Sequence, residues 1–239
     1  MTDEAQYGAN VSWKPVEPPD RVVLSGRYVR VEPLRVATHG ADLFRAAHGP
    51  GADPELWSYM PNGPYGAERA FLDDLTEREA SLDPLFFAIV DPRTSEAKGV
   101  ASLMRIDATN GVGEIGHIWF GPQLQRTRAA TESIYLLANY LLTTLGYRRF
   151  EWKCNALNAR SRRAAVRYGF TYEGIFRQHM VVKGRNRDTA WYAIVDADWP
   201  AIRARSAQGA RVVRATMPHP SHPDRPDRRV RWHRAAASG

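Results

Sequence analysis

One short segment of the sequence combines residue types that could bind an anion. Between Gln125 and Thr131, two arginines and two small residues stand where the longest predicted helix begins. The first turn of a helix leaves backbone N–H groups without partners, and the helix dipole attracts anions to that end. Ala129 and Ala130 leave room for a phosphate to approach the main chain, and Arg126 and Arg128 add positive charge. The segment therefore predicts a diphosphate site, with an ordinary capped helix start as the alternative.

A predicted strand and two predicted helices surround this segment. Strand 113–120 alternates its side chains, which predicts two faces: Ile115, His117 and Trp119 on one, and Glu114, Gly116, Ile118 and Phe120 on the other. Apolar residues recur at helical spacing from Ala130 to Leu145, and Gly146 follows as an end signal. A shorter helix is expected over 158–168, with Asn158 at its N-cap and Ser161 three residues later. That pairing is common helix-start chemistry and needs no ligand.

The rest of the pattern predicts a single α+β domain over residues 21–205. We expect a strand or tight hairpin in 21–34, helices at 37–48, 53–60 and 67–80, strands at 85–90, 98–107 and 149–154, and a hairpin of 170–183 with 188–196. Residues 1–20 contain several prolines and are expected to form an extended arm.

The composition excludes several classes of protein. A chain of 239 residues with 44% apolar residues can build a packed core, so it is neither wholly disordered nor fibrous. No stretch approaches the roughly 18 apolar residues of a membrane span. The acidic N-terminus lacks the apolar region of a secretory signal, so we expect a cytoplasmic protein. A lone cysteine, Cys154, excludes an internal disulfide, and no metal-ligand spacing is present.

The net charge of +7 is concentrated at the C-terminus. Residues 201–239 carry nine arginines and two aspartates, an excess equal to that of the whole chain. The segment 206–239 is rich in Arg and Pro and holds a single aromatic residue, Trp232, so we expect it to be mostly disordered. It is either a solvated basic appendage or an arm that contacts RNA or the ribosome.

Two motifs give the chain a family resemblance. Gln125, Arg128 and Ala130, followed by Thr131 and Glu132, resemble motif A (Q/R-x-x-G-x-G/A) of the GCN5-related N-acetyltransferases (GNAT), with arginine at the first glycine position. The second motif resembles the N-x-x-S and G-F-x-x-E-G run of the ribosomal-protein N-terminal acetyltransferase (RimJ/RimL-type) branch: Asn158, Ser161, Gly169, Phe170, Glu173 and Gly174. The motifs stand in the family's order, and the resemblance covers roughly residues 21–200.

The resemblance implies a fold and a cofactor. The fold would be a mixed, mostly antiparallel twisted sheet, flanked by helices and splayed in its middle, with acetyl-CoA in the opening. The contacts to acetyl-CoA would come from the backbone of Ile118, Trp119 and Phe120, from the loop residues Gln125, Arg126, Thr127, Arg128, Ala129, Ala130 and Thr131, and from Asn158 and Ser161. A backbone N–H on strand 113–120 would stabilise the oxyanion.

The resemblance also implies the catalytic roles. Ser161 would protonate the departing CoA thiolate, because the tyrosine that many members use for this step is replaced by Val166. Glu114 is the first candidate for the general base, since it lies on the strand beside the cofactor; the alternative is a solvated carboxylate. His117 is expected on the opposite face as a core histidine, and His179 is a lower-ranked base. Cys154 is not expected to act as a nucleophile.

The predicted activity is transfer of an acetyl group to a primary amine, either a protein N-terminus or a small molecule, in a ternary complex. Trp57, Tyr59, Met60 and Tyr65 are candidates for the acceptor pocket, with core packing as the alternative, and Arg185, Arg187 and Asp188 could rim its entrance. Two other functions stay open: a non-catalytic acyl-CoA-binding module, and a ribosome- or RNA-associated protein that acts through its basic tail. The sequence allows a monomer or a homodimer.

Overall fold

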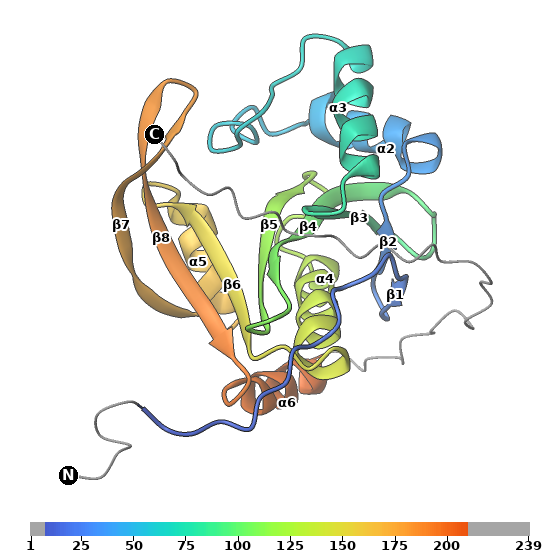
Figure 1. The fold of residues 1–239 in the computed structure, drawn as a ribbon. Coiled ribbons are helices and arrows are strands. Elements are labelled where there is room, and N and C mark those ends of the chain that lie inside the picture. The colour runs from blue at the N-terminus through green and yellow to red at the C-terminus, as the bar shows by residue number, and fades with distance from the viewer. Residues whose placement is uncertain (1–7, 210–239) are drawn as a thin grey trace, which may run out of the picture.

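One eight-stranded sheet forms the centre of the molecule (Figure 1). The computed structural model describes residues 8–209, with side chains described as far as Arg205. The strand order is β1-β2-β3-β4-β5-β6-β8-β7, and of the described strand pairs only β5–β6 is parallel. The strands are β1 (Leu24–Ser25), β2 (Arg30–Pro33), β3 (Leu85–Val90), β4 (Ala97–Asp107), β5 (Val112–Phe120), β6 (Arg149–Asn155), β7 (Thr171–Val182) and β8 (Arg185–Val195). The helices are α2 (Val36–His48), α3 (Glu68–Ala80), α4 (Arg128–Asn139), the π-helix η1 (Tyr140–Thr144), α5 (Ala159–Arg167) and α6 (Trp199–Gly209). The expected α+β fold with a mixed, mostly antiparallel sheet is confirmed.

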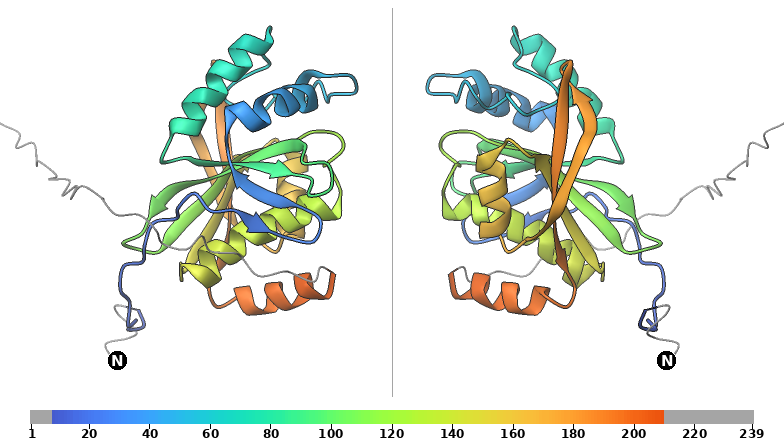
Figure 2. Two further views of the ribbon diagram at one scale, coloured as in Figure 1. Left: turned by 90° about the vertical axis from the view of Figure 1, so that its right-hand side faces the viewer. Right: turned by 90° about the vertical axis from the view of Figure 1, so that its left-hand side faces the viewer.

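Helices cover both faces of the sheet and create two apolar cores. Helices α2 and α3 lie on one side, and α4 and α6 lie on the other (Figure 2). On the α4 side, Ile134 and Leu137 pack with Phe87 of β3, whereas on the α2/α3 side Leu43 and Phe71 belong to the same cluster as Val100. Strand β3 is buried along its whole length because it lies between both layers, which explains its continuous run of apolar residues.

Strands β5 and β6 separate halfway along their length. They pair only from Val112 with Arg149 to Ile115 with Trp152. Beyond this point β5 remains paired with β4 as far as Phe120, and β6 remains paired with β8 as far as Asn155. The sheet therefore has an opening in its middle, bordered by the second half of β5 and the end of β6. We call it the β5–β6 opening.

A β-bulge lies in β5 where the opening begins. Ser102 pairs with Gly116 and Val100 with Trp119, so β5 contains one more residue than β4 across this step. His117 has a φ of +49°, which few residues other than glycine adopt. The extra residue reverses the side-chain alternation beyond it.

The predicted alternation of strand 113–120 is therefore wrong beyond Gly116. Trp119 is buried in the α2/α3 core, on the same side as Glu114, while Ile118 and Phe120 pack against the α4 core. His117 contacts Phe86, another residue of the α2/α3 core, so it lies on the side of Glu114 rather than opposite.

Most other predicted elements are present with small changes at their ends. The helix expected at 53–60 is wrong: these residues form turns, because Pro54 and Pro61 bound a segment too short to be stable as a helix. The long helix predicted from Ala130 becomes the π-helix η1 in its last turn.

The two ends of the chain are only partly described. Residues 8–23 form neither helix nor strand, and Trp13 Nε1 donates to the carbonyl of Thr109 beside the β4–β5 turn. Most of the predicted tail, from residue 210 on, lies outside the described residues. No helix in the described part of the chain is long and apolar enough to cross a membrane.

Candidate functional site

The start of α4 presents unpaired backbone N–H groups. Thr127 is the N-cap, and its Oγ1 accepts a hydrogen bond from the amide of Ala130 at 3.1 Å. Within the described residues, the amides of Arg126, Arg128 and Ala129 donate to no protein acceptor. Arg126 has a φ of +60°, and a left-handed residue next to a helix start turns successive N–H groups into an anion-binding concavity. The predicted diphosphate segment thus has the donors that an anion needs.

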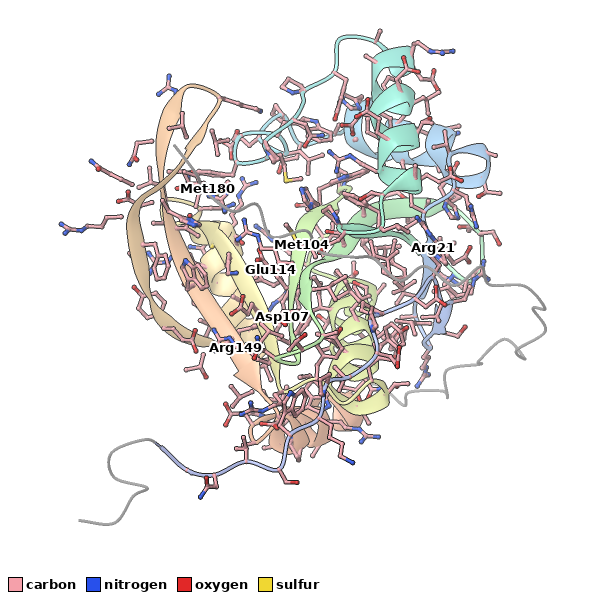
Figure 3. The ribbon with its side chains drawn as sticks, viewed as in Figure 1. Arg21, Met104, Asp107, Glu114, Arg149 and Met180 are labelled. Atoms are coloured by element: carbon pink, nitrogen blue, oxygen red, sulfur yellow. The ribbon has the colours of Figure 1, made fainter. Side chains whose placement is uncertain are left out.

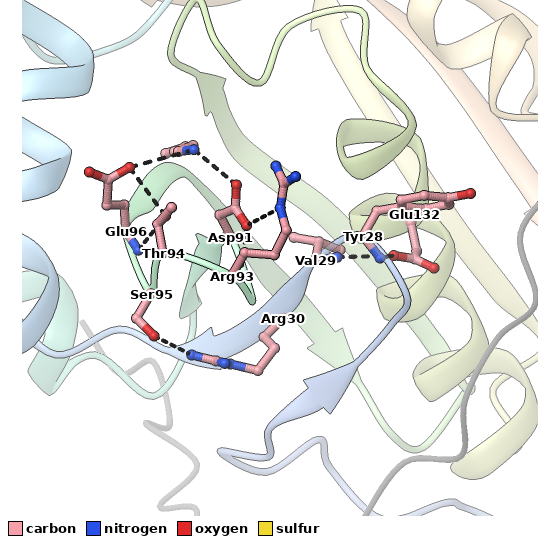
Figure 4. Close-up of polar contacts among 10 residues, drawn as sticks. Tyr28, Val29, Arg30, Asp91, Arg93, Thr94, Ser95, Glu96 and Glu132 are labelled. Atoms are coloured by element: carbon pink, nitrogen blue, oxygen red, sulfur yellow. Dashed lines mark hydrogen bonds and ion pairs between the residues drawn. The ribbon is translucent and has the colours of Figure 1, made fainter.

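A buried carboxylate holds this helix against the sheet (Figure 4). Glu132 is 2% exposed and accepts hydrogen bonds from the amides of Arg27 at 2.9 Å, Tyr28 at 2.6 Å and Val29 at 3.1 Å. A Cβ on Gly26 would lie 2.4 Å from the Glu132 carboxylate, so a larger residue there would displace the carboxylate from its hydrogen bonds. The β1–β2 loop and the first turn of α4 therefore keep one relative position, which fixes where the free amides point.

The side chain of Arg128 packs against an aromatic ring beside a cavity. The guanidinium of Arg128 lies over the ring of Tyr28, 5.8 Å from its centroid, and Nη1 is 3.3 Å from the Tyr28 hydroxyl. It lines a cavity of about 500 Å³ together with Arg93 of the β3–β4 turn and Lys98 of β4. The Gln125 side chain closes the loop by donating to the carbonyl of Phe120. The Arg128 guanidinium is therefore positioned by Tyr28 at the edge of this cavity, while the Arg128 backbone N–H stays unpaired within the described residues.

The start of α5 faces the end of β6. Asn158 is the N-cap, as predicted, and its Oδ1 accepts a hydrogen bond from the amide of Ser161 at 3.0 Å. The Ser161 hydroxyl accepts a hydrogen bond from Trp152 Nε1 at 3.0 Å and lies within hydrogen-bond reach of the Cys154 sulfur, toward which its own proton can be donated. Its sulfur neighbour Cys154 is 6% exposed, and burial raises the pKa of that thiol.

On the opposite side of the sheet, charged side chains gather at the base of the opening, where Figure 3 labels Glu114 of β5 and Arg149 of β6. Lys153 Nζ lies 2.9 Å from Glu114 Oε2 and 2.6 Å from Glu151 Oε2, and Arg105 Nη1 lies 3.6 Å from Glu114 Oε2. Glu114 and Glu151 are paired positions of the parallel β5 and β6. Arg149 connects Glu151 to the exposed rim by contacting Glu173. We call Glu114, Lys153, Glu151 and Arg105 the charged cluster.

Burial controls the pKa values of this region. It raises the pKa of Glu114, which is 5% exposed, while the ammonium of Lys153 opposes the shift. Burial, assisted by the positive charge of Arg78, lowers the pKa of His117 to about 4. Burial also lowers the pKa of His179, assisted by the positive charges of Arg105, Arg187 and Lys153. Both histidines are therefore neutral at pH 7, and Glu114 is not the solvated carboxylate of the alternative interpretation.

The loop between α2 and α3, residues 49–67, reaches across to the elements on the far side of the opening. The Tyr59 hydroxyl donates to the carbonyl of Leu157 at 3.2 Å, and Arg160 of α5 lies 2.7 Å from Asp53. Lys183, at the tip of the β7–β8 hairpin, donates to the carbonyls of Trp57 at 2.9 Å and Gly63 at 2.7 Å. The loop is thus tied to both α5 and the hairpin.

The four predicted acceptor residues divide into two pairs. Trp57 is 4% exposed and stacks on His48, while Tyr65 packs edge-on against it, and burial raises the pKa of Tyr65 to about 12. Both rings are parts of an aromatic cluster with Phe71, as core packing requires. Tyr59 is 39% exposed and Met60 is partly buried at the edge of the same core.

The sequence interpretation missed Lys153, Arg105 and Trp191. Lys153 lies 3.9 Å from the centre of the Trp191 ring and joins β6 to β8 beneath the opening. A signal was available, because Glu151 and Lys153 alternate with Phe150, Trp152 and Cys154 along β6 and so place two charges on one face of a buried strand. Arg105 gave no such signal, since its φ of +49° results from a second bulge, in β4.

The comparisons with known proteins agree with this geometry. A family model described as an acetyltransferase (GNAT) domain matches residues 30–171. The chain belongs to the GNAT acetyltransferase family. It is similar to a GCN5-related N-acetyltransferase of Brucella melitensis, whose crystal structure is 46% identical with a TM-score of 0.80 and covers 82% of this chain and 89% of that one. A GNAT-family structure from Chromobacterium violaceum is 37% identical with a TM-score of 0.74, over 80% of this chain and 95% of that one.

The name of one curated relative states the substrate of that protein. The ribosomal-protein-serine acetyltransferase of Escherichia coli (strain K12) is 30% identical over 106 residues, which are 44% of this chain and 59% of that protein. GNAT enzymes use acetyl-CoA as the acyl donor, so the free amides at the start of α4 have a fitting ligand in its diphosphate. Among the residues described, no group of His, Cys, Asp and Glu side chains is arranged to hold a metal ion.

Proposed function

We propose that the protein transfers the acetyl group of acetyl-CoA to a primary amine, by direct attack of the amine within a ternary complex. The β5–β6 opening is the observation that carries this proposal. On its α4/α5 side lie the free amides of Arg126, Arg128 and Ala129 and the Ser161 hydroxyl. On its other side lies the charged cluster with Glu114. A donor and an acceptor can therefore meet in the opening from opposite faces of the sheet.

On the donor side, the chain supplies backbone and hydroxyl groups. The free amides of the α4 start hold the diphosphate, and the edge of β5 from Gly116 to Phe120 supplies backbone groups that no neighbouring strand of the sheet occupies on the β6 side. An N–H on this edge stabilises the negative charge that develops on the thioester oxygen. Ser161 donates its proton to the departing thiolate, and Asn158 Nδ2 is left to bond the pantetheine arm, since Oδ1 caps α5.

On the acceptor side, Glu114 is the proposed general base. Because the pKa of Glu114 is raised, it lies closer to the pKa of an amine than the pKa of an exposed glutamate does, and this improves proton transfer. The cations Lys153 and Arg105 disfavour an ammonium in the opening and so favour the neutral, reactive amine. For an α-amine this deprotonation costs only about 1.4 kcal/mol at pH 7, against about 4.6 kcal/mol for a lysine side chain. We therefore favour a peptide N-terminus as acceptor, as in the relative that acts on ribosomal-protein serine.

The test is a turnover assay with acetyl-CoA and a panel of amines that includes peptides, with release of the CoA thiol and acetylated product measured together. Glu114→Gln should lower kcat/KM by about 100-fold or more, the usual contribution of a general base, and leave acetyl-CoA affinity within about twofold. Glu77→Gln, an exposed carboxylate of α3, is the matched control. His179→Gln tests the alternative base. Saturable acetyl-CoA binding without acetylation of any amine would instead establish a non-catalytic module.

A further inference from the structure

Three polar groups in and beside the charged cluster are buried without a hydrogen-bond partner among the described residues. They are Glu114 Oε2, Arg187 Nε and Trp191 Nε1, from β5 and β8. Buried polar atoms of this kind are uncommon in native proteins and indicate a group that is satisfied by something else. Glu114 has a charge partner in Lys153, and the Trp191 indole is neutral. Of the two charged residues in this set, only Arg187 has no ion pair among the described residues.

The register of the sheet places Arg187 at the mouth of the β5–β6 opening. Strand β6 ends at Asn155, which pairs with Thr189 of β8, so Arg187 lies two residues beyond the end of β6. Side chains of a strand alternate, so Arg187, Thr189 and Trp191 share one face. That face is the one on which Lys153 contacts Trp191 and Glu114. Arg187 therefore lies on the same face of the sheet as the charged cluster, just beyond the end of β6.

The charges around Arg187 leave one cation in excess. Burial lowers the pKa of Arg187, and among the charges that act on it are those of Glu114 and Arg105. Glu114 already contacts Lys153 and Arg105, and Glu151 contacts Lys153 and Arg149. His179, on the neighbouring β7, is neutral and bonded to Thr189, so it offers no negative charge. The Arg187 guanidinium is half-buried with its Nε shielded from solvent, and a partly desolvated cation without its own carboxylate is stabilised when a ligand supplies one.

We propose that the acceptor carries a carboxylate beside its amine, and that Arg187 binds this carboxylate and selects for it. The inference rests on the proposed function, because it names the class of amine that the opening accepts. Arg187 presents a planar fork of N–H donors that matches a carboxylate. The carboxylate stems either from a free amino acid or from an acidic side chain near a peptide N-terminus; both have the same chemistry at Arg187. The acceptor would then balance the excess positive charge on binding.

The neighbouring hairpin arginine provides a matched control. Arg185 is exposed two residues before Arg187 on the same strand, and no ion pair or side-chain hydrogen bond is found for it among the described residues. Arg187→Gln and Arg185→Gln remove the same charge from the same hairpin. They differ in that the Arg187 guanidinium is half-buried and close enough to feel the charges of Glu114 and Arg105, whereas Arg185 is exposed two residues further from the cluster.

Two pairs of acceptors test the proposal by turnover with acetyl-CoA. The first pair is an amino acid and its amide, and the second is a peptide with Asp or Asn at position two. The wild-type protein should show a kcat/KM about tenfold or more higher for the charged member of one pair, and that pair identifies the source of the carboxylate. Arg187→Gln should reduce this ratio to within about threefold of unity, mainly through KM, while Arg185→Gln retains it. Arg187→Glu should reverse the preference.

The outcomes separate this inference from the proposed function. A wild-type ratio near unity in both pairs, or a preference that survives Arg187→Gln, overturns the role of Arg187 even if amines are acetylated. If no amine is acetylated, the proposed function fails. Calorimetry then decides the inference by binding alone, with the N-acetylated members of both pairs titrated into the protein saturated with CoA. Tighter binding of the charged member of either pair that is lost in Arg187→Gln supports the carboxylate site, and equal binding within both pairs overturns it.

Discussion

Replacing Lys153 with methionine should destabilise the protein in a manner that depends on pH. The Lys153 side chain is 6% exposed, and its ammonium contacts two carboxylates, Glu114 and Glu151, at paired positions of β5 and β6. Methionine has a similar length and keeps the packing on Trp191, so the change removes mainly the charge. Removal of one partner from a buried ion pair usually costs about 3–5 kcal/mol, because the other charge stays buried without compensation.

The structure places the expected loss near the lower end of that range. Glu151 keeps Arg149 at 2.6 Å, and Glu114 keeps Arg105 at 3.6 Å, although the Arg105 side chain is 45% exposed. We therefore expect a loss of about 3 kcal/mol near pH 8. In a domain of this size each kcal/mol corresponds to a Tm change of about 2–4 °C, so Tm should fall by about 6–12 °C.

The pH dependence follows from the direction of the Glu114 shift. Burial raises the folded-state pKa of Glu114 above its unfolded value, and the loss of Lys153 raises it further. A carboxyl group with a raised folded pKa favours the folded state when protonated, and that contribution is lost as pH rises through the folded pKa. The penalty of Lys153→Met should therefore be smaller at pH 5 than at pH 8.

Urea unfolding followed by circular dichroism at both pH values measures this effect. The double variant Glu114→Gln/Lys153→Met is the decisive comparison, because it removes the uncompensated carboxylate. It should be more stable than Lys153→Met alone at pH 8. Additive losses in the double variant, or a Lys153→Met penalty that does not change with pH, would refute the assignment of Lys153 as the buried counter-charge of Glu114.

Two further predictions concern the donor side of the opening. Arg128→Pro should weaken acetyl-CoA binding by about tenfold or more relative to Arg128→Ala, because proline removes one unpaired N–H. Proline is tolerated at the first helical position, and Thr127 before it is already extended. Equal affinities of the two variants by calorimetry would contradict the diphosphate site. Ser161→Ala should lower kcat by about tenfold or more and leave acetyl-CoA affinity unchanged, as expected for a proton donor; a lower Tm with normal kinetics would instead assign Ser161 to packing against Trp152.

Local sequence patterns predicted most of the elements but not how they meet. The apolar spacing of α3 and the continuous apolar run of β3 gave these elements directly. The N-cap of α5 followed from the type of residue at Asn158. These features depend on neighbours in the chain, so a single sequence contains their signal.

The bulges and the charged cluster depend on contacts between distant segments. His117 and Arg105 adopt positive φ values without being glycine, so nothing in their residue type marks the bulge that redirects each side chain. Lys153 reaches Glu114 because the crossover through α4 makes β5 and β6 parallel neighbours. Local sequence patterns therefore could not predict the ion-pair partners of Glu114 or the face of the sheet on which His117 lies.

The two sides of the opening differ in a way that supports direct transfer. The donor side holds neutral groups, the free amides and the Ser161 hydroxyl, and its thiol, Cys154, is buried with a raised pKa that disfavours the nucleophilic thiolate. The acceptor side holds the carboxylates and cations that can control the protonation of an amine. Under the proposed assignment each substrate has its own side of the sheet, so neither would have to leave before the other binds. A covalent acetyl-enzyme would then gain nothing, whereas the proposed ternary complex would use both sides of the opening at once.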